Sequence, residues 1–121
     1  MRYTKIFNII NKDYNHENPN IPRSEDFSKE FKRIISNKVK GKYTVVNHHK
    51  GYCECSGFLT DGNGHYVYYS SGDFRFNPRW YNNILVRIAK DTTDYVGGIN
   101  HYTDIDNFAN IVNGLFGYLK R

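Results

Sequence analysis

Long apolar runs are missing from this sequence. No stretch approaches the ~18–20 consecutive apolar residues that a membrane-spanning helix needs. Residues 1–17 also lack the apolar region and the small-residue cleavage site of a secretory signal peptide. We therefore expect a cytoplasmic protein with no membrane partner. Its 121 residues show no internal repeat, so we expect one domain spanning residues 1–121.

Cysteine is scarce, with only Cys53 and Cys55 present. Two strand residues two apart point to the same sheet face, which is a poor geometry for a mutual disulfide. We expect free thiols. His48 and His49 lie nearby, but a regular strand sends neighbouring side chains to opposite faces, so without a bulge both cannot bind one zinc ion. We expect no metal and no cofactor.

Catalytic signatures are also missing. The chain has no serine elbow, no P-loop and no paired-carboxylate motif. The glycine pair in "YVGGIN" has neither the spacing nor the following helix of a dinucleotide-binding fingerprint. Polar residues in or beside the expected loops could supply an acid–base pair, but no motif joins any two of them. These are His65, Asp73, Arg75, Asp94 and His101. We expect no enzyme activity, with a small nuclease or hydrolase using His65, Asp73 and His101 as an alternative.

Positive charge is what the chain does have, and it is unevenly placed. The net charge is +5. Residues 1–50 hold 11 Lys and Arg against 5 Asp and Glu, whereas residues 51–121 hold 6 against 7. The excess therefore lies in the first 50 residues. Clustered positive charge favours an anionic partner, nucleic acid first among them, although it also serves solubility alone.

The first half of the chain predicts a strand, a loop and a helix. Residues 1–10 alternate and are rich in β-formers, and residues 11–23 have the composition of a loop. Residues 24–41 predict a helix, with Ser24 as N-cap and Gly41 at its end. Its apolar stripe is Phe27, Phe31, Ile34, Ile35 and Val39.

From residue 42 the apolar period changes to two. Four strands are expected, at residues 42–49, 51–60, 65–71 and 82–90. A hairpin turn at 60–65 joins the second and third of them. Residues 91–101 predict a glycine-hinged connection. Thr103 would then open a final helix over 103–121, with Asp106 completing a capping box. Its expected buried side is Ile105, Phe108, Ile111, Val112, Leu115, Phe116 and Leu119.

These elements predict an α+β fold with the order β-α-β-β-β-β-α. Both helices are amphipathic, so each must bury one face. The simplest arrangement is an antiparallel sheet of four to five strands, covered on one face by the two helices.

The polar side of the first helix is basic. Its members recur at three- and four-residue steps, which places them on one surface. They are Lys29, Lys32, Arg33, Ser36 and Lys40. This surface is either an ordinary solvated face or one that follows phosphates or docks an acidic protein.

The stretch "SSGDFRFNPRWYNN" (70–83) concentrates aromatic and basic residues. Arg75, Arg79, Trp80 and Tyr81 belong to the types enriched at interface hot spots and suited to stacking on unpaired bases. We expect them to form an exposed patch together with the basic helix side. Two alternatives remain open: the tryptophan closes one end of the core, or the stretch lines a small-ligand pocket.

The middle third of the chain resembles a segment of small proteins from phages and integrative elements of low-GC Gram-positive bacteria. It runs from "YVYYSSGDFRF" through "WYNNILVRIAK" to "DYVGGINHYT". The residues that carry the resemblance are Tyr68, Ser70, Asp73, Arg75, Trp80, Asn83, Arg87, Asp94, Tyr95, Gly97, Gly98 and Thr103. Such proteins are often counter-defence factors, including anti-CRISPR inhibitors of RNA-guided nucleases. The resemblance implies a stoichiometric binder without a cofactor, acting in the bacterial host cell.

The expected function is therefore a non-enzymatic inhibitor that binds a protein or nucleoprotein of bacterial defence. Its expected contacts are Lys29, Lys32, Arg33, Lys40, Arg75, Arg79, Trp80 and Tyr81. The alternative is a sequence-independent nucleic-acid-binding domain. Inhibitors that mimic DNA are strongly acidic, and this chain is basic, so an acidic protein surface, a guide RNA or a target DNA is the expected contact.

Overall fold

The structure is a computed structural model that describes residues 24–51, 53–72, 79–94 and 97–120. The strand expected at 1–10 and the loop expected at 11–23 lie outside these residues. The elements, in chain order, are α2 (Ser24–Lys38), β1 (Thr44–Lys50), β2 (Glu54–Thr60), β3 (Tyr66–Gly72), the 3₁₀ helix η1 (Trp80–Asn82), β4 (Ile84–Ala89), β5 (His101–Thr103) and α3 (Phe108–Leu119).

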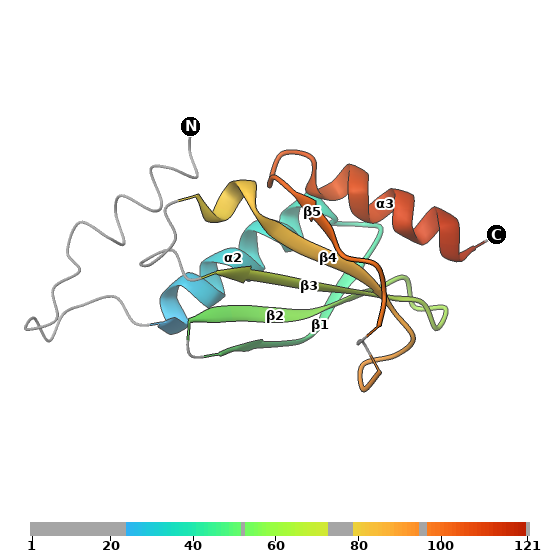
Figure 1. Cartoon of the computed structure of the whole chain (residues 1–121), viewed down its shortest axis with the longest axis horizontal. Helices are drawn as coiled ribbons and strands as arrows, with labels where there is room; N and C mark the ends of the chain where they lie inside the picture. Colours follow the sequence, from blue (N-terminus) through green and yellow to red (C-terminus); the bar gives the residue numbers. More distant parts are fainter. Residues whose placement is uncertain (1–23, 52, 73–78, 95–96, 121) are drawn as a thin grey trace, which may run out of the picture.

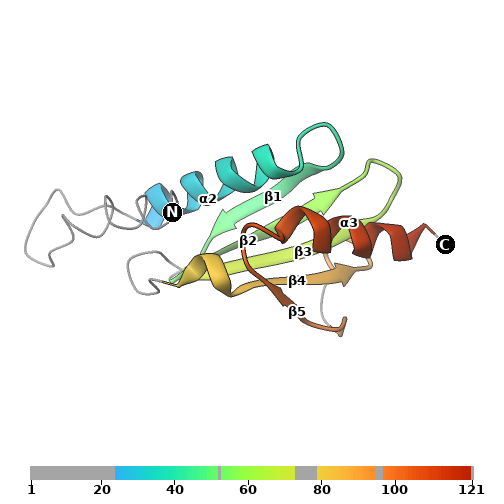
Figure 2. The ribbon, with the colours of Figure 1, turned by 90° about the horizontal axis from the view of Figure 1, so that it is seen from above.

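The α+β prediction is confirmed. The strands form one antiparallel sheet in the order β1-β2-β3-β4-β5, so every strand pairs with its neighbour in the sequence. Both helices lie on the same face of this sheet (Figures 1 and 2). Helix α2 packs over β1 and β2, α3 packs over β3 and β4, and the two helices touch each other.

The fifth strand and the start of the last helix differ from the sequence prediction. Thr103 pairs with Ile84 at the end of β5 instead of opening a helix, and its hydroxyl donates to the Asp104 carbonyl at 2.9 Å. A turn follows, in which Asp104 Oδ1 accepts from the Asn107 amide at 2.7 Å. Helix α3 begins only at Phe108, so the expected capping box of Thr103 and Asp106 is wrong. Because Thr103 is the last residue of a paired strand, it does not serve as the N-cap of the helix.

The core lies between the helices and the sheet. The whole predicted stripe of the first helix is buried, each side chain at most 4% exposed: Phe27, Phe31, Ile34, Ile35 and Val39. On α3, Phe108, Val112 and Phe116 are buried, but Ile111 is 36% exposed, which corrects its predicted burial. Burial of one such side chain contributes about 1.5–3 kcal/mol, which is what holds both helices on the sheet.

The sheet face away from the helices carries a row of two aromatic residues and one arginine. Phe58, Tyr68 and Arg87 lie on neighbouring strands in register. The Phe58 and Tyr68 rings meet edge to face at 5.5 Å, and the Arg87 guanidinium lies 5.0 Å from the centre of the Tyr68 ring. Cation–π and ring contacts thus link three strands on the face away from the helices.

Candidate functional site

The basic side of α2 faces solvent. Lys29, Lys32 and Arg33 are exposed, while Phe31 and Ile34 on the same helix are buried. This split follows from the helical period, which sends residues one step apart to different sides. The sequence prediction of an exposed basic surface on this helix is therefore confirmed for these three residues.

One acidic residue lies within this basic side. Glu30 accepts from the Arg33 guanidinium one turn along the helix, with Nε 3.1 Å from Oε1. An exposed pair of this kind contributes only about 0–1 kcal/mol to stability. It orients the arginine and leaves the surface with an excess of positive charge, because Lys29 and Lys32 are not matched by further carboxylates among the described residues of α2 from Phe27 onward.

Lys40 lies beyond the helix. α2 ends at Lys38, and Gly41, with φ of 85°, belongs to the turn that follows. Lys40 is exposed within this turn. Lys38 instead reaches toward α3, with Nζ 3.8 Å from Asp106 Oδ1. The basic surface therefore extends past the helix end into the turn, although Lys40 is not part of the helix as expected.

The aromatic half of the expected patch is wrong. Trp80 is fully buried, and its ring meets Phe31 edge to face at 6.0 Å. Tyr81 is half-buried against the same core, and its carbonyl accepts from the Ile105 amide at 2.6 Å. Burial of such a large ring is favourable because it removes a large apolar area from water. Trp80 thus closes the core, which is the alternative that the sequence left open.

Two arginines of this stretch, Arg75 and Arg79, were expected in the patch. Arg75 lies outside the described residues. Arg79 is exposed just before η1, which leads into β4, whereas α2 packs over β1 and β2. Trp80, the residue after Arg79, contacts Phe31 on the buried side of α2. The expected contacts that lie on α2 or in the turn just after it are Lys29, Lys32, Arg33 and Lys40.

A buried polar network under α2 was missed by the sequence analysis. Its origin is a β-bulge in β1, where the register with β2 shifts between Val46 and His49. Asn47 adopts φ of 52° at this bulge, a conformation that asparagine tolerates better than most residues. His48 consequently turns toward the helices. The signal in the sequence was an asparagine immediately before a histidine pair in an otherwise alternating strand.

His48 bonds to two elements at once. Its Nε2 lies 2.8 Å from Ser28 Oγ and 3.0 Å from the Ser28 carbonyl oxygen, and its Nδ1 bonds to the Tyr69 hydroxyl. A carbonyl only accepts, so Nε2 carries the proton, and Nδ1 accepts from Tyr69. With Nε2 protonated, it cannot take a proton from Ser28. The network therefore joins α2, β1 and β3 and does not form a nucleophile–base pair.

Burial and neighbouring charge set the protonation of this network. Desolvation lowers the pKa of His48 below its usual 6.5, and Lys32 and His49 lower it further, against the opposing hydrogen bond with the Ser28 backbone. Burial raises the pKa of Tyr69 well above its usual value, and Cys55 adds to this. The neutral forms of both side chains are thus favoured, as a desolvated network requires.

The histidines and cysteines considered for a metal site lie on or beside β1 and β2. Cys53 is exposed and Cys55 is buried, both as free thiols, as predicted. His49 Nε2 lies 3.4 Å from Ser56 Oγ. Within the described ranges, no three His, Cys, Asp or Glu side chains gather to hold a metal ion.

For the hydrolase alternative, His65 and His101 have different surroundings. His65 Nδ1 bonds Asp61 Oδ2 at 2.6 Å in the turn between β2 and β3. His101 lies on β5 beside apolar side chains, and Asp73 lies outside the described residues. Partial desolvation raises the pKa of Asp61, but hydrogen bonds from His65 and the Asn63 amide outweigh it, so the pKa is lowered overall. This pair stabilises the turn.

Among the described residues, neither helix has the length and apolar character needed to cross a membrane. Comparison with known protein families, with curated protein sequences and with solved structures finds no match to this chain.

Proposed function

We propose that this protein is a non-enzymatic counter-defence inhibitor from a mobile element, which binds a nucleoprotein such as an RNA-guided nuclease through the basic side of α2. The observation that carries the proposal is the exposure of Lys29, Lys32 and Arg33 on one side of a helix whose other side is anchored in the core. A row of exposed cations on a helix that is anchored in the core suits an anionic partner.

The burial of Trp80 changes the kind of interface that is proposed. With its ring in the core, this residue supplies no aromatic anchor, and the interaction depends mainly on charge. Charge-based binding is screened by salt, with a Debye length of about 8–10 Å at physiological ionic strength. We therefore expect inhibition that weakens clearly between low and physiological salt.

The anionic contact is either the nucleic acid of the complex or an acidic surface of its protein. Affinity for nucleic acid falls log-linearly with salt, with a slope of about −0.9 per phosphate neutralised on duplex DNA. Three cations would give a slope of about −3 by this relation. An acidic protein surface binds the inhibitor without guide RNA or target DNA, so titration against the protein alone separates the two contacts.

The test is a pair of charge-reversal variants. Lys32→Glu with Arg33→Glu removes the centre of the basic side, and Lys90→Glu with Lys120→Glu changes the net charge equally at exposed positions elsewhere. We expect the first variant to weaken inhibition of nuclease cleavage by about tenfold or more, a loss of about 1.4 kcal/mol in binding, and the second to inhibit as wild type does.

Two results would contradict the proposal. Equal inhibition by both variants would mean that the basic side of α2 is only a solvated surface. Binding of free RNA or DNA that is lost in the first variant, with no inhibition of any nuclease by wild type, would favour the nucleic-acid-binding domain instead. Circular dichroism of both variants confirms that the fold is kept.

A further inference from the structure

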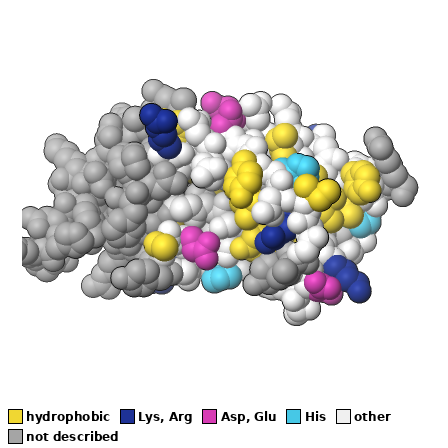
Figure 3. All heavy atoms as spheres, viewed as in Figure 1, with side chains coloured by type: hydrophobic (Ala, Val, Ile, Leu, Met, Phe, Trp, Pro, Cys, Tyr) yellow, Lys and Arg dark blue, Asp and Glu magenta, His cyan; other side chains and the backbone are white. Residues whose placement is uncertain are grey.

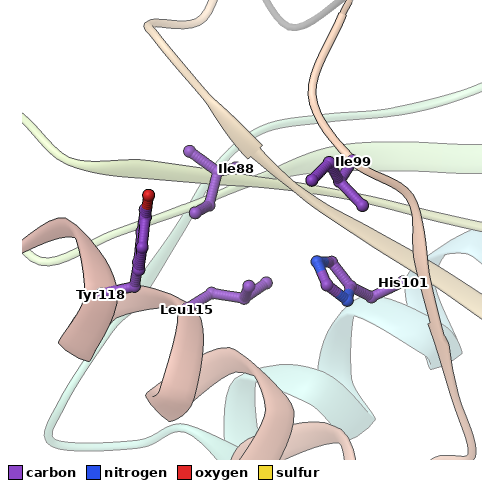
Figure 4. A pocket seen from close by; sticks show the side chains of 5 residues that line it. All are labelled: Ile88, Ile99, His101, Leu115 and Tyr118. Atoms are coloured by element: carbon purple, nitrogen blue, oxygen red, sulfur yellow. The ribbon is translucent and has the colours of Figure 1, made fainter.

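A hollow opens between α3 and the far edge of the sheet, away from β1 and β2. Its volume is about 340 Å³. The lining side chains come from three places: Leu115 and Tyr118 from α3, Ile88 from β4, and Ile99 and His101 from β5 and the residues before it. Figure 4 shows these five side chains around one open space, with the α3 residues facing the isoleucines.

The position of Ile99 in the wall of the hollow is fixed by its two neighbours in the chain, Gly98 and Asn100. A Cβ atom on Gly98 would lie 2.6 Å from the Ile88 carbonyl oxygen and 2.6 Å from Arg87 Cγ, so only glycine lets the chain approach β4 this closely. On the other side, Asn100 Oδ1 accepts from Arg87 Nη1 at 3.1 Å. Ile99 is therefore held beside Ile88 by contacts on both sides, which gives Gly98, the second glycine of "YVGGIN", a structural role.

The rim of this hollow leaves large apolar groups in water. Ile99 is 78% exposed and Tyr118 is 65% exposed. Figure 3 shows hydrophobic side chains gathered on the right of this face, toward the C-terminal end of α3. Exposed isoleucine costs free energy in proportion to its apolar area unless something covers it. A pre-formed, mostly apolar hollow with a few polar groups is the usual form of a small-molecule site.

The chemistry of the lining selects the ligand. None of the five side chains carries a carboxylate, an ammonium or a guanidinium, so a charged ligand would lose its hydration without gaining a counter-ion. The imidazole of His101 and the phenol of Tyr118 are the polar groups in this lining. The volume stands at the lower end of the ~300–1,000 Å³ range of ligand sites.

We propose that this hollow is a binding site for a small neutral molecule with one or two rings and one hydrogen-bonding group. The apolar body would contact Ile88, Ile99 and Leu115, and the polar group would bond to His101 or Tyr118. This site is independent of the basic side of α2, so either proposal can fail without the other.

Indole serves as the probe, because it is a neutral bicyclic ring with one N–H donor. Titration into the ¹⁵N-labelled protein should give saturable shifts at the amides of the five lining residues. Indole-3-acetate, its anionic relative, should bind about tenfold or more weakly, since its carboxylate finds no partner there. Shifts that do not saturate, or that appear equally at Tyr102 on the other sheet face, would overturn the proposal.

The matched variants are Ile99→Glu and Ile111→Glu. Both replace an exposed isoleucine by a carboxylate, but only Ile99 lines the hollow. We expect Ile99→Glu to weaken indole binding about tenfold or more and Ile111→Glu to leave it unchanged. Leu115→Trp, which fills the hollow, should abolish binding if it folds. Equal binding by both glutamate variants, or a concentration-dependent dimer formed through the same residues, would show that the hollow is not a ligand site.

Discussion

Gly57 on β2 pairs with Tyr69 on β3, and the Tyr69 side chain fills the space that a Cβ atom on Gly57 would need. A Cβ atom on Gly57 would lie 2.6 Å from Tyr69 Oη, 2.9 Å from its Cζ and 3.0 Å from the His48 Cα. The ring of Tyr69 crosses the glycine to reach His48. One glycine thus makes room for the hydroxyl that completes the buried network.

Substitution of this glycine tests the arrangement. Gly57→Ala should lower the free energy of unfolding by about 1–3 kcal/mol, because the added methyl overpacks a buried site. Urea denaturation measures this change. The double variant Gly57→Ala with Tyr69→Phe should recover part of the loss, since the shortest contact is with the hydroxyl. An alanine variant as stable as wild type would show that the ring moves aside freely.

The second prediction concerns Trp80, for which the sequence analysis expected a surface position. Trp80→Ala should lower the free energy of unfolding by about 3–5 kcal/mol, as expected for a fully buried large ring. Tyr102→Ala, at a residue that is 62% exposed, should change it by only about 0.5 kcal/mol or less. Thermal and urea unfolding report both values. A small effect at Trp80 would contradict its place in the core.

The His48 network predicts a pH dependence of stability. Because the pKa of His48 is lowered in the folded state, the unfolded chain binds more protons than the folded chain as pH falls below about 6.5. The stabilisation is therefore present above this pH and is lost progressively on acidification. We expect the urea midpoint of wild type to fall between pH 7.5 and 5.5.

His48→Gln identifies the source of this change. Glutamine keeps hydrogen-bonding groups at this position but does not titrate, so the fall between pH 7.5 and 5.5 should be smaller than in wild type. His101→Gln, at an exposed position on β5, should keep the wild-type behaviour. An unchanged fall in His48→Gln would place the titrating group elsewhere.

The glycines of α3 give a prediction of opposite sign. A Cβ atom on Gly114 or Gly117 meets no atom within 4 Å, and both positions are exposed. Alanine at either site should raise the free energy of unfolding by about 0.5–1 kcal/mol, because glycine loses more backbone entropy in a helix. A loss of stability in the thermal unfolding of Gly114→Ala would mean that this helix needs its flexibility.

The sequence predicted the periodic parts of this fold well. The helix stripe from Phe27 to Val39 and the alternation in β3 and β4 each repeat a burial signal several times, so one exception does not hide it. It predicted β5 poorly. Three residues, with His101 and Tyr102 exposed, carry almost no periodicity, and only pairing with β4 defines them as a strand.

The same contrast between periodic and non-periodic residues applies to the candidate site. Lys29, Lys32 and Arg33 could be placed on one exposed side because helical spacing fixes their relation to Phe31. Trp80 could not be placed, since an aromatic residue before a strand suits a surface contact and a core equally. The His48 network depends on a bulge at Asn47, which brings Ser28 and Tyr69 together from positions about 20 residues away on either side.

The sequence by itself determined the α+β class, the two amphipathic helices and the concentration of positive charge in the first 50 residues, because these depend on composition and on local spacing. Only the tertiary structure decided that Trp80 lies in the core, that His48 turns under α2 and that Gly98 holds Ile99 over a hollow. Each of these depends on contacts between segments distant in the chain, and local spacing carries no information about such contacts.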